Sequence, residues 1–268
     1  MRSKLQIIPI NTGEADVKKT LDIFWSLSME TGVVTVPLLT FLIKGAEVPI
    51  LVDSGLRDPE RAMSVMKLGP HRTKPEWDLA RQLRKQGVEP DEVKYLILTH
   101  LHYEHCGKCE IFPNAKIIIQ RTELQEAAAP IAPEALETGG RALFYDRQDV
   151  ALIVGNLWNR VTLIDGDEEI VGGVKCVLFK NSHTPGSQAV YVDTPGGTSI
   201  LLGDIARNVH LNIEKQIPPG LYYDLRSMQA TLARLLREGT FFYPTHDYDV
   251  LRRFSNRKEE KKTPGVKS

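Results

Sequence analysis

Short apolar runs alternate with amphipathic stretches along most of this chain. Runs of about four to eight apolar or β-branched residues favour strands, and apolar positions three and four residues apart favour helices. Strands are expected at Leu5–Ile10, Pro37–Ile43, Val48–Val52, Tyr95–Thr99, Ala115–Gln120, Val161–Ile164, Val174–Lys180, Gln188–Asp193, Ser199–Leu202 and Thr240–Tyr243, and helices at Pro75–Gly87, Thr122–Ala128 and Asp224–Arg237. Strands that alternate with helices predict an α/β fold.

Two segments depart from this alternation. Residues 130–160 are rich in Ala, Pro and Gly with little periodicity, which predicts an irregular insertion of short helices and loops. From about residue 252 onward Arg, Lys, Glu and Pro dominate, which predicts a charged, solvated or frayed tail. A length of 268 residues and a hydrophobic content of 42% fit one sizeable core. We therefore expect a single domain over residues 1–268.

Five of the seven histidines lie in three short motifs, each after an expected strand. The motifs are His100-Leu101-His102-Tyr103-Glu104-His105, Ser182-His183-Thr184 and Thr245-His246-Asp247, and Asp204 lies between the last two. Imidazole is the commonest protein ligand for zinc-like metals, and a catalytic site collects such ligands from separate loops. The alternative of scattered core histidines is weak, because so many buried imidazoles would be costly without a cation.

Charge and cysteine content limit the classes of binding partner and the cellular compartment that we expect. The 34 basic and 34 acidic residues give zero net charge, which disfavours nucleic acid or an anionic membrane and favours a small-molecule substrate. Three cysteines do not make a disulfide framework, and free thiols are expected at Cys106 and Cys109. The start lacks a signal-peptide pattern, and no apolar segment approaches the roughly 20 residues of a membrane span. A soluble, cytoplasmic protein is expected, with a homodimer as one option.

The order of the metal-ligand candidates carries a family resemblance. The His100–His105 motif, followed by His183, Asp204 and His246, resembles the dinuclear metal-binding pattern of the metallo-β-lactamase superfamily. Gly203-Asp204-Ile205-Ala206, Asn208, Glu214, Ile217-Pro218-Pro219-Gly220 and His246-Asp247 resemble, more loosely, its N-acyl homoserine lactonase branch. The resemblance implies a four-layer αββα sandwich of two similar halves, with the metal ions at one edge.

The resemblance also implies two divalent transition-metal ions, with Zn²⁺ expected first and Mn or Fe as alternatives. It implies that one ion is held by His100, His102 and His183, the other by Glu104, His105 and His246, and that Asp204 bridges them. Ions in such a site lower the pKa of bound water, so that a hydroxide becomes the nucleophile. Asp53 and Ser54, in the turn after an expected strand, are candidates to orient the imidazoles.

Two positions depart from the family pattern. Glu104 stands where an aspartate is usual, and the extra methylene leaves two interpretations: a ligand or proton carrier of a second ion, or a glutamate beside a mononuclear site. Arg207 follows the bridging aspartate where a tyrosine is usual. It could bind a substrate carboxylate or stabilise an oxyanion, or form only a structural salt bridge. Tyr222 or Tyr223 could instead supply a hydroxyl to the attacked carbonyl.

The expected function is metal-dependent hydrolysis of a lactone or similar cyclic ester or amide. Thioester hydrolysis of the glyoxalase II type, phosphodiester cleavage, and a non-catalytic, metal-stabilised binding protein are the alternatives, and zero net charge disfavours nuclease activity. The apolar stretch around Trp25 could roof a substrate pocket or belong to the core. His71 is expected to be a surface loop residue.

Overall fold

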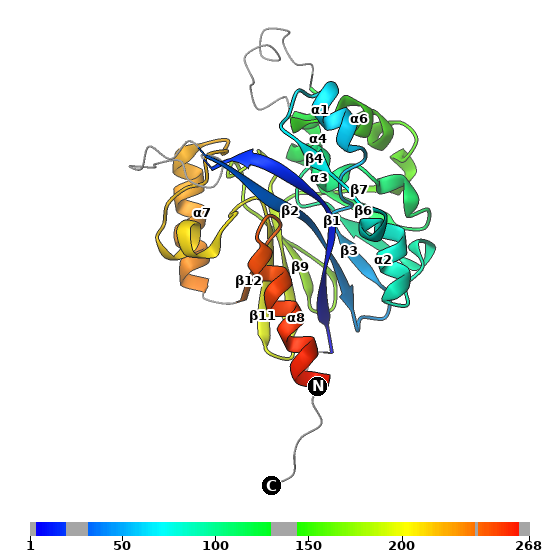
Figure 1. Ribbon diagram of the computed structural model, residues 1–268. Coiled ribbons are helices and arrows are strands. Elements are labelled where there is room, and N and C mark those ends of the chain that lie inside the picture. Colours follow the sequence, from blue (N-terminus) through cyan, green and yellow to red (C-terminus); the bar gives the residue numbers. More distant parts are fainter. Residues whose placement is uncertain (1–3, 20–31, 130–143, 239–240, 263–268) are drawn as a thin grey trace.

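Two β-sheets pack face to face between layers of helices in the computed structural model, which describes residues 4–19, 32–129, 144–238 and 241–262 (Figure 1). The seven-stranded sheet has the order β4-β1-β2-β3-β5-β6-β7, and the five-stranded sheet has the order β12-β11-β10-β9-β8. Every strand of the large sheet precedes every strand of the small sheet. Each half of the chain therefore builds one sheet, and the expected αββα sandwich is confirmed.

The large sheet consists of β1 (Gln6–Lys18), β2 (Val33–Lys44), β3 (Ile50–Val52), β4 (His71–Arg72), β5 (Tyr95–Ile97), β6 (Lys116–Gln120) and β7 (Val161–Ile164). The small sheet consists of β8 (Glu168–Val171), β9 (Val174–Leu178), β10 (Gln188–Thr194), β11 (Gly197–Gly203) and β12 (Phe241–Pro244). The α-helices are α1 (Pro59–Ser64), α2 (Leu79–Lys85), α3 (Tyr103–Cys106), α4 (Arg121–Ala128), α6 (Arg147–Val154), α7 (Leu225–Glu238) and α8 (Tyr248–Lys262). Short 3₁₀ turns lie at Pro75–Trp77, Pro90–Glu92, Cys109–Ile111 and Trp158–Arg160, and a π-helical turn at Val209–Glu214.

Apolar faces account for the layers. Residues such as Val52 of the large sheet and Val190 of the small sheet share one buried cluster between the sheets. The outer face of the large sheet packs against α2, α4 and α6. The outer face of the small sheet packs against Met228, Leu232 and Leu235 of α7, whose spacing places them on one side of that helix. None of the described helices is long and apolar enough to cross a bilayer.

Parallel pairing brings several strand ends to one edge of the sandwich. In the large sheet β3 pairs with β5 and β5 with β6 in parallel, and in the small sheet β11 pairs with β12 in parallel. Their carboxyl ends lead into the loops with Asp53, His100, Asp204 and His246. Carboxyl ends of parallel strands are where α/β proteins place their sites, so this edge is the place to look for chemistry.

Several predicted elements match the structure and others are extended, divided or new. β7 has the predicted bounds, while β1 runs well beyond Ile10 because an irregular pairing between Asn11 and Gly13 carries the strand past its polar residues. The predicted helix Pro75–Gly87 is divided, because the Asp78 side chain accepts a hydrogen bond from Arg81 N and begins α2 there. The short strands β4 and β8 were not predicted.

The two irregular segments have different outcomes. Residues 130–143 lie outside the described residues, as does the apolar stretch around Trp25, while α6 and the turn at Trp158–Arg160 are short helical elements of the predicted kind. Of the predicted solvated or frayed tail, residues 252–262 are helical as part of α8 and Arg252 and Arg253 are exposed, while residues 263–268 lie outside the described residues. Val250 in the first turn of α8 is fully buried and anchors the helix.

Candidate metal centre

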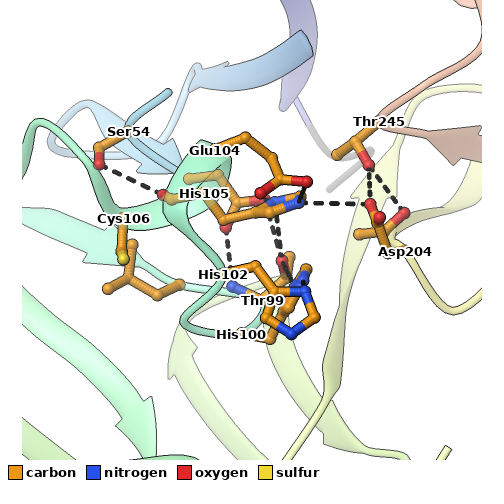
Figure 2. Close-up of polar contacts among 12 residues, drawn as sticks. Ser54, Thr99, His100, His102, Glu104, His105, Cys106, Asp204 and Thr245 are labelled. Atoms are coloured by element: carbon orange, nitrogen blue, oxygen red, sulfur yellow. Dashed lines mark hydrogen bonds and ion pairs between the residues drawn. The ribbon is translucent and has the colours of Figure 1, made fainter. Parts of the chain in front are cut away.

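Seven buried side chains of metal-ligand type gather where loops from the two sheets meet. Figure 2 shows His100, His102, Glu104, His105 and Asp204 among them. The loop after β5 and the short helix α3 carry His100, His102, Glu104 and His105. The other three follow strands of the small sheet: His183 after β9, Asp204 after β11 and His246 after β12. The structure thus brings together every residue that the sequence suggested as a ligand, and neither half of the chain provides the set alone.

The seven side chains divide into two groups. One contains His100, His102 and His183, the other contains Glu104, His105, Asp204 and His246, and within each group the ligand atoms lie within 4.8 Å of one another. In the first group Nδ1 of His102 lies 3.1 Å from Nε2 of His100 and 3.1 Å from Nε2 of His183. Ligand atoms that converge at this spacing can share one ion, since metal–nitrogen bonds are about 2.0–2.1 Å long.

Asp204 lies between the two groups. Its Oδ1 is 3.0 Å from Nε2 of His246 and 3.3 Å from Nε2 of His105, while its Oδ2 is 3.9 Å from Nε2 of His183. Each carboxylate oxygen therefore faces a different group. This is the geometry that a bridging ligand requires.

Hydrogen bonds to the outer ring nitrogens fix the imidazoles. Nδ1 of His105 lies 2.8 Å from Oδ2 of Asp53, Nδ1 of His183 lies 3.1 Å from the Leu221 carbonyl, and Nδ1 of His246 lies 2.9 Å from the Pro37 carbonyl. These partners only accept, so Nδ1 of each ring donates to them and Nε2 is the atom that faces the site.

Buried polar atoms test whether a cation fits. Among the described residues Oε2 of Glu104, Nε2 of His105 and Nε2 of His246 are buried without a hydrogen-bond partner. Such atoms are costly unless something coordinates them. All three belong to the second group, so one bound cation could satisfy all of them. A set of imidazoles and carboxylates suits a divalent transition metal, so the residues present fit the expected ions.

Burial and charge set the protonation of the imidazoles differently in the two groups. Burial lowers the pKa of His183 to about 4 and holds the pKa of His100 and His102 well below its ordinary range, so the first group is neutral and ready to coordinate. Burial alone would also lower the pKa of His105. The nearby carboxylates of Asp53 and Asp204 outweigh it and raise that pKa well above its ordinary value.

Glu104 reaches the second group despite its extra methylene. Its Oε1 lies 3.8 Å from Nε2 of His246 and 3.9 Å from Nε2 of His105. Glu104 lies in α3, the short helical turn Tyr103–Cys106. A carboxylate at this distance is consistent with a ligand of a second ion.

Arg207 contacts the bridging carboxylate directly. Its Nη1 donates to Oδ2 of Asp204 at 2.9 Å, and the residue is only 7% exposed. Tyr223 is half-buried, and its backbone N–H donates to the Ser182 carbonyl at 2.6 Å, which fixes the segment beside His183. The suggested action of either side chain on a substrate carbonyl stays a prediction.

The turn after β3 supports the His105 loop. Asp53 has a φ of 63° and accepts from both the backbone N–H and the hydroxyl of Thr99, at 2.8 and 2.9 Å. Ser54 contacts the backbone rather than the ring of His105, donating from N at 2.7 Å and from Oγ at 3.2 Å to its carbonyl (Figure 2). On the other side, Thr245 donates to Oδ1 of Asp204 at 2.7 Å.

The prediction of a surface position for His71 is wrong. His71 is 5% exposed, because β4 pairs with β1 and its Nε2 lies 2.7 Å from the Tyr103 hydroxyl.

The three cysteines are buried free thiols in the structure, as expected for Cys106 and Cys109. Sequence reasoning also missed Glu123, a fully buried carboxylate beside the first group. Its position in the first turn of a predicted helix is ordinary for a glutamate and gave no signal.

Comparison of the sequence with known protein families assigns the chain to one of them. The metallo-beta-lactamase superfamily profile matches residues 36–246, a span that includes all seven ligand-type residues. The chain belongs to the metallo-β-lactamase superfamily. An N-acyl homoserine lactonase of Bacillus thuringiensis is 31% identical to this superfamily member over 192 residues, 68% of each chain. The N-acyl homoserine lactonase AttM of Rhizobium radiobacter is 28% identical over 184 residues, 66% of this chain and 67% of AttM.

Solved structures resemble this superfamily member over most of its length. A crystal structure of the quorum-quenching N-acyl homoserine lactone hydrolase superposes with a TM-score of 0.75 at 25% identity, covering 99% of this chain and 98% of that one. AidC, a dizinc quorum-quenching lactonase in complex with a product, superposes with a TM-score of 0.67 at 16% identity, covering 92% and 88% of the two chains. At that identity the likeness to AidC concerns the fold alone.

Proposed function

We propose that this superfamily member is a metal-dependent hydrolase that opens a lactone or a similar cyclic ester or amide. The observation that carries the proposal is Asp204, whose two oxygens face two separate groups of buried ligand-type side chains. The N-acyl homoserine lactonase relatives suggest the substrate class. Zero net charge is consistent with a small, uncharged substrate.

In this proposal His100, His102 and His183 would hold one divalent ion, Glu104, His105 and His246 would hold a second, and Asp204 would offer one oxygen to each. Zn²⁺ is the expected metal, and Mn or Fe would fit the same ligand types. Divalent ions in such a pair lower the pKa of a coordinated water toward neutrality and polarise a carbonyl oxygen. The protein holds the ligands in register through Asp53 and the carbonyls that accept from the imidazoles.

The chain's own groups then act on the substrate. Ring opening places negative charge first on the carbonyl oxygen and then on the product carboxylate, so a donor must face it. Arg207, which contacts Asp204, is the proposed donor, and the Tyr223 hydroxyl is the second candidate. Asp204 and Glu104, the two carboxylates of the second group, are the groups that can accept a proton beside the scissile bond.

Metal analysis followed by a substrate panel tests the proposal. Protein purified without chelator should contain close to two transition-metal ions per chain and should release acid from lactones in a pH-indicator assay. Thioesters and phosphodiesters, the alternative substrate classes, should react more slowly. A metal content near zero would contradict the hydrolase proposal, and preference for a thioester or phosphodiester would contradict the lactone assignment.

A further inference from the structure

One buried carboxylate, Glu123, ties together the two loops that carry the first metal group. Glu123 lies in the first turn of α4 and is fully buried. Its Oε1 accepts from the backbone N–H of Leu101 at 2.9 Å and from the Tyr145 hydroxyl at 3.2 Å. Its Oε2 accepts from the Thr184 hydroxyl at 2.6 Å and from the backbone N–H of Gly186 at 3.0 Å.

The donors lie next to ligand positions. Leu101 lies between His100 and His102, and Thr184 directly follows His183. The ring of Tyr145, a third donor, packs on His102 with its centroid 5.0 Å away. One carboxylate therefore spans two loops that are far apart in sequence and both supply the first group.

Close packing makes this contact specific. A Cβ on Gly186 would lie 2.4 Å from the backbone nitrogen of Glu123, so only glycine permits the approach of the His183 loop to α4. The backbone of that loop thus lies directly against the start of α4. Because this contact is closely packed, a displacement of the Glu123 carboxylate would also displace His183.

The charge of Glu123 has no basic side chain as a partner among the described residues. Burial raises its pKa above the ordinary value, and the four donors favour the ionised form. The second metal group contains two carboxylates, Glu104 and Asp204, whereas the first contains only three imidazoles. A cation bound by those imidazoles would therefore lie near a buried negative charge and would help to neutralise it.

We propose that Glu123 is a positioning residue for the first metal group, which holds the His102 and His183 loops in register and adds a buried carboxylate to the one that Asp204 turns toward that group. The inference rests on the proposed function, because it presupposes that His100, His102 and His183 bind an ion.

Hydrogen-bond chemistry explains why glutamine cannot replace Glu123. Each carboxylate oxygen accepts one backbone N–H, from Leu101 on one side and from Gly186 on the other. A glutamine amide has only one oxygen, so its NH₂ group must face one of these N–H groups. Glu123→Gln therefore removes the charge and loosens one of the two loops.

Affinity for Co²⁺ or Zn²⁺, measured by competition with a chelator on the full-length metal-free chain, tests the proposal. Glu123→Gln is compared in two backgrounds. In His246→Ala, where the second group lacks a ligand, Glu123→Gln should weaken binding at the first group at least tenfold and alter the visible spectrum of bound Co²⁺. In His102→Ala, where the first group is broken, it should leave the remaining affinity unchanged. Glu126→Gln, an exposed glutamate on the same helix, is the matched control and should have no effect in either background.

Each outcome decides the question. Equal loss in both backgrounds, or no loss in His246→Ala, would overturn the positioning role. If Glu123→Gln does not fold by circular dichroism, Tyr145→Phe replaces it, since it removes one hydrogen bond and keeps the ring on His102. It should weaken the first group about threefold, and an unchanged affinity would overturn the proposal. Failure of the unmodified chain to bind any metal would instead contradict the proposed function.

Discussion

Single hydrogen bonds decide which atom of each side chain faces the metal groups. Carbonyl or carboxylate partners hold the Nδ1 protons of His105, His183 and His246, so Nε2 of each ring faces the metal groups. His102 differs, because its Nδ1 is the atom that faces the other two imidazoles of the first group. These contacts prepare the ligands before an ion arrives, which lowers the reorganisation that binding requires.

Glu104 should act as a ligand of the second ion. Glu104→Asp keeps a carboxylate and should retain most of the second ion and at least partial activity, whereas Glu104→Gln removes the charge and should lower metal content toward one ion per chain. Elemental analysis and a lactone assay on both variants provide the measurement. Identical behaviour of the two variants would show that the carboxylate does not coordinate.

Arg207 should stabilise the charge that develops during ring opening. Arg207→Ala should lower kcat/KM at least about tenfold, or roughly 1.4 kcal/mol of transition-state stabilisation, without lowering metal content. Arg207→Lys keeps the charge but loses the planar guanidinium, so its kcat/KM should lie between the values of the unmodified protein and Arg207→Ala. A wild-type rate in Arg207→Ala would leave only a structural salt bridge to Asp204 and move attention to Tyr223.

The ligand-type residues could be predicted from sequence because each follows a strand and because imidazoles clustered in this way are costly to bury without a cation. His71 and Glu123 could not be predicted. His71 stands beside Gly69 and Pro70, which are typical of a loop, and only pairing with β1 and contact with Tyr103 bury it. Glu123 looks like any acidic residue at a helix start, and its partners are as many as 63 residues away. Long-range contacts of this kind leave no local pattern.

At the scale of elements, tight backbone contacts join the His105 loop to the turn after β3. Gly107 donates its N–H to the Gly55 carbonyl at 3.0 Å, and Ser54 donates to the His105 carbonyl. Predicted and observed strands agree best where an apolar run is flanked by turn residues, as in β7. They agree least where polar residues are carried along by pairing, as in β1 and β8.

Gly107→Ala should disturb this contact. A Cβ there would lie 2.4 Å from Arg57 N and 2.8 Å from the Gly55 carbonyl, both backbone atoms that cannot turn aside. We expect a loss of about 2 kcal/mol in the free energy of unfolding, together with weaker binding at the second group because Asp53 shifts away from His105. Urea unfolding measures the free energy of unfolding, and competition with a chelator measures metal binding at the second group. Gly172→Ala, where a Cβ meets nothing within 4 Å, is the control and should leave both unchanged.

For the whole molecule, metal binding should stabilise the fold. An ion that binds the native state at about a hundred times its Kd adds roughly 2.7 kcal/mol, which corresponds to about 5–10 °C in Tm for a chain of this size. Removal of metal by a chelator should lower Tm by this order, and added Zn²⁺ should restore it. An unchanged Tm after complete loss of metal would show that the seven residues are stable without ions.

The turn between β7 and β8, around Gly166, divides the ligands as cleanly as it divides the sheets. Residues before it supply His100, His102, Glu104 and His105, and residues after it supply His183, Asp204 and His246. A chain cut at this turn would give two fragments, each with one complete sheet and an incomplete set of ligands. Reassembly of the fragments would bury the apolar faces of both sheets again, and bound metal would strengthen it because its ligands come from two separately encoded parts.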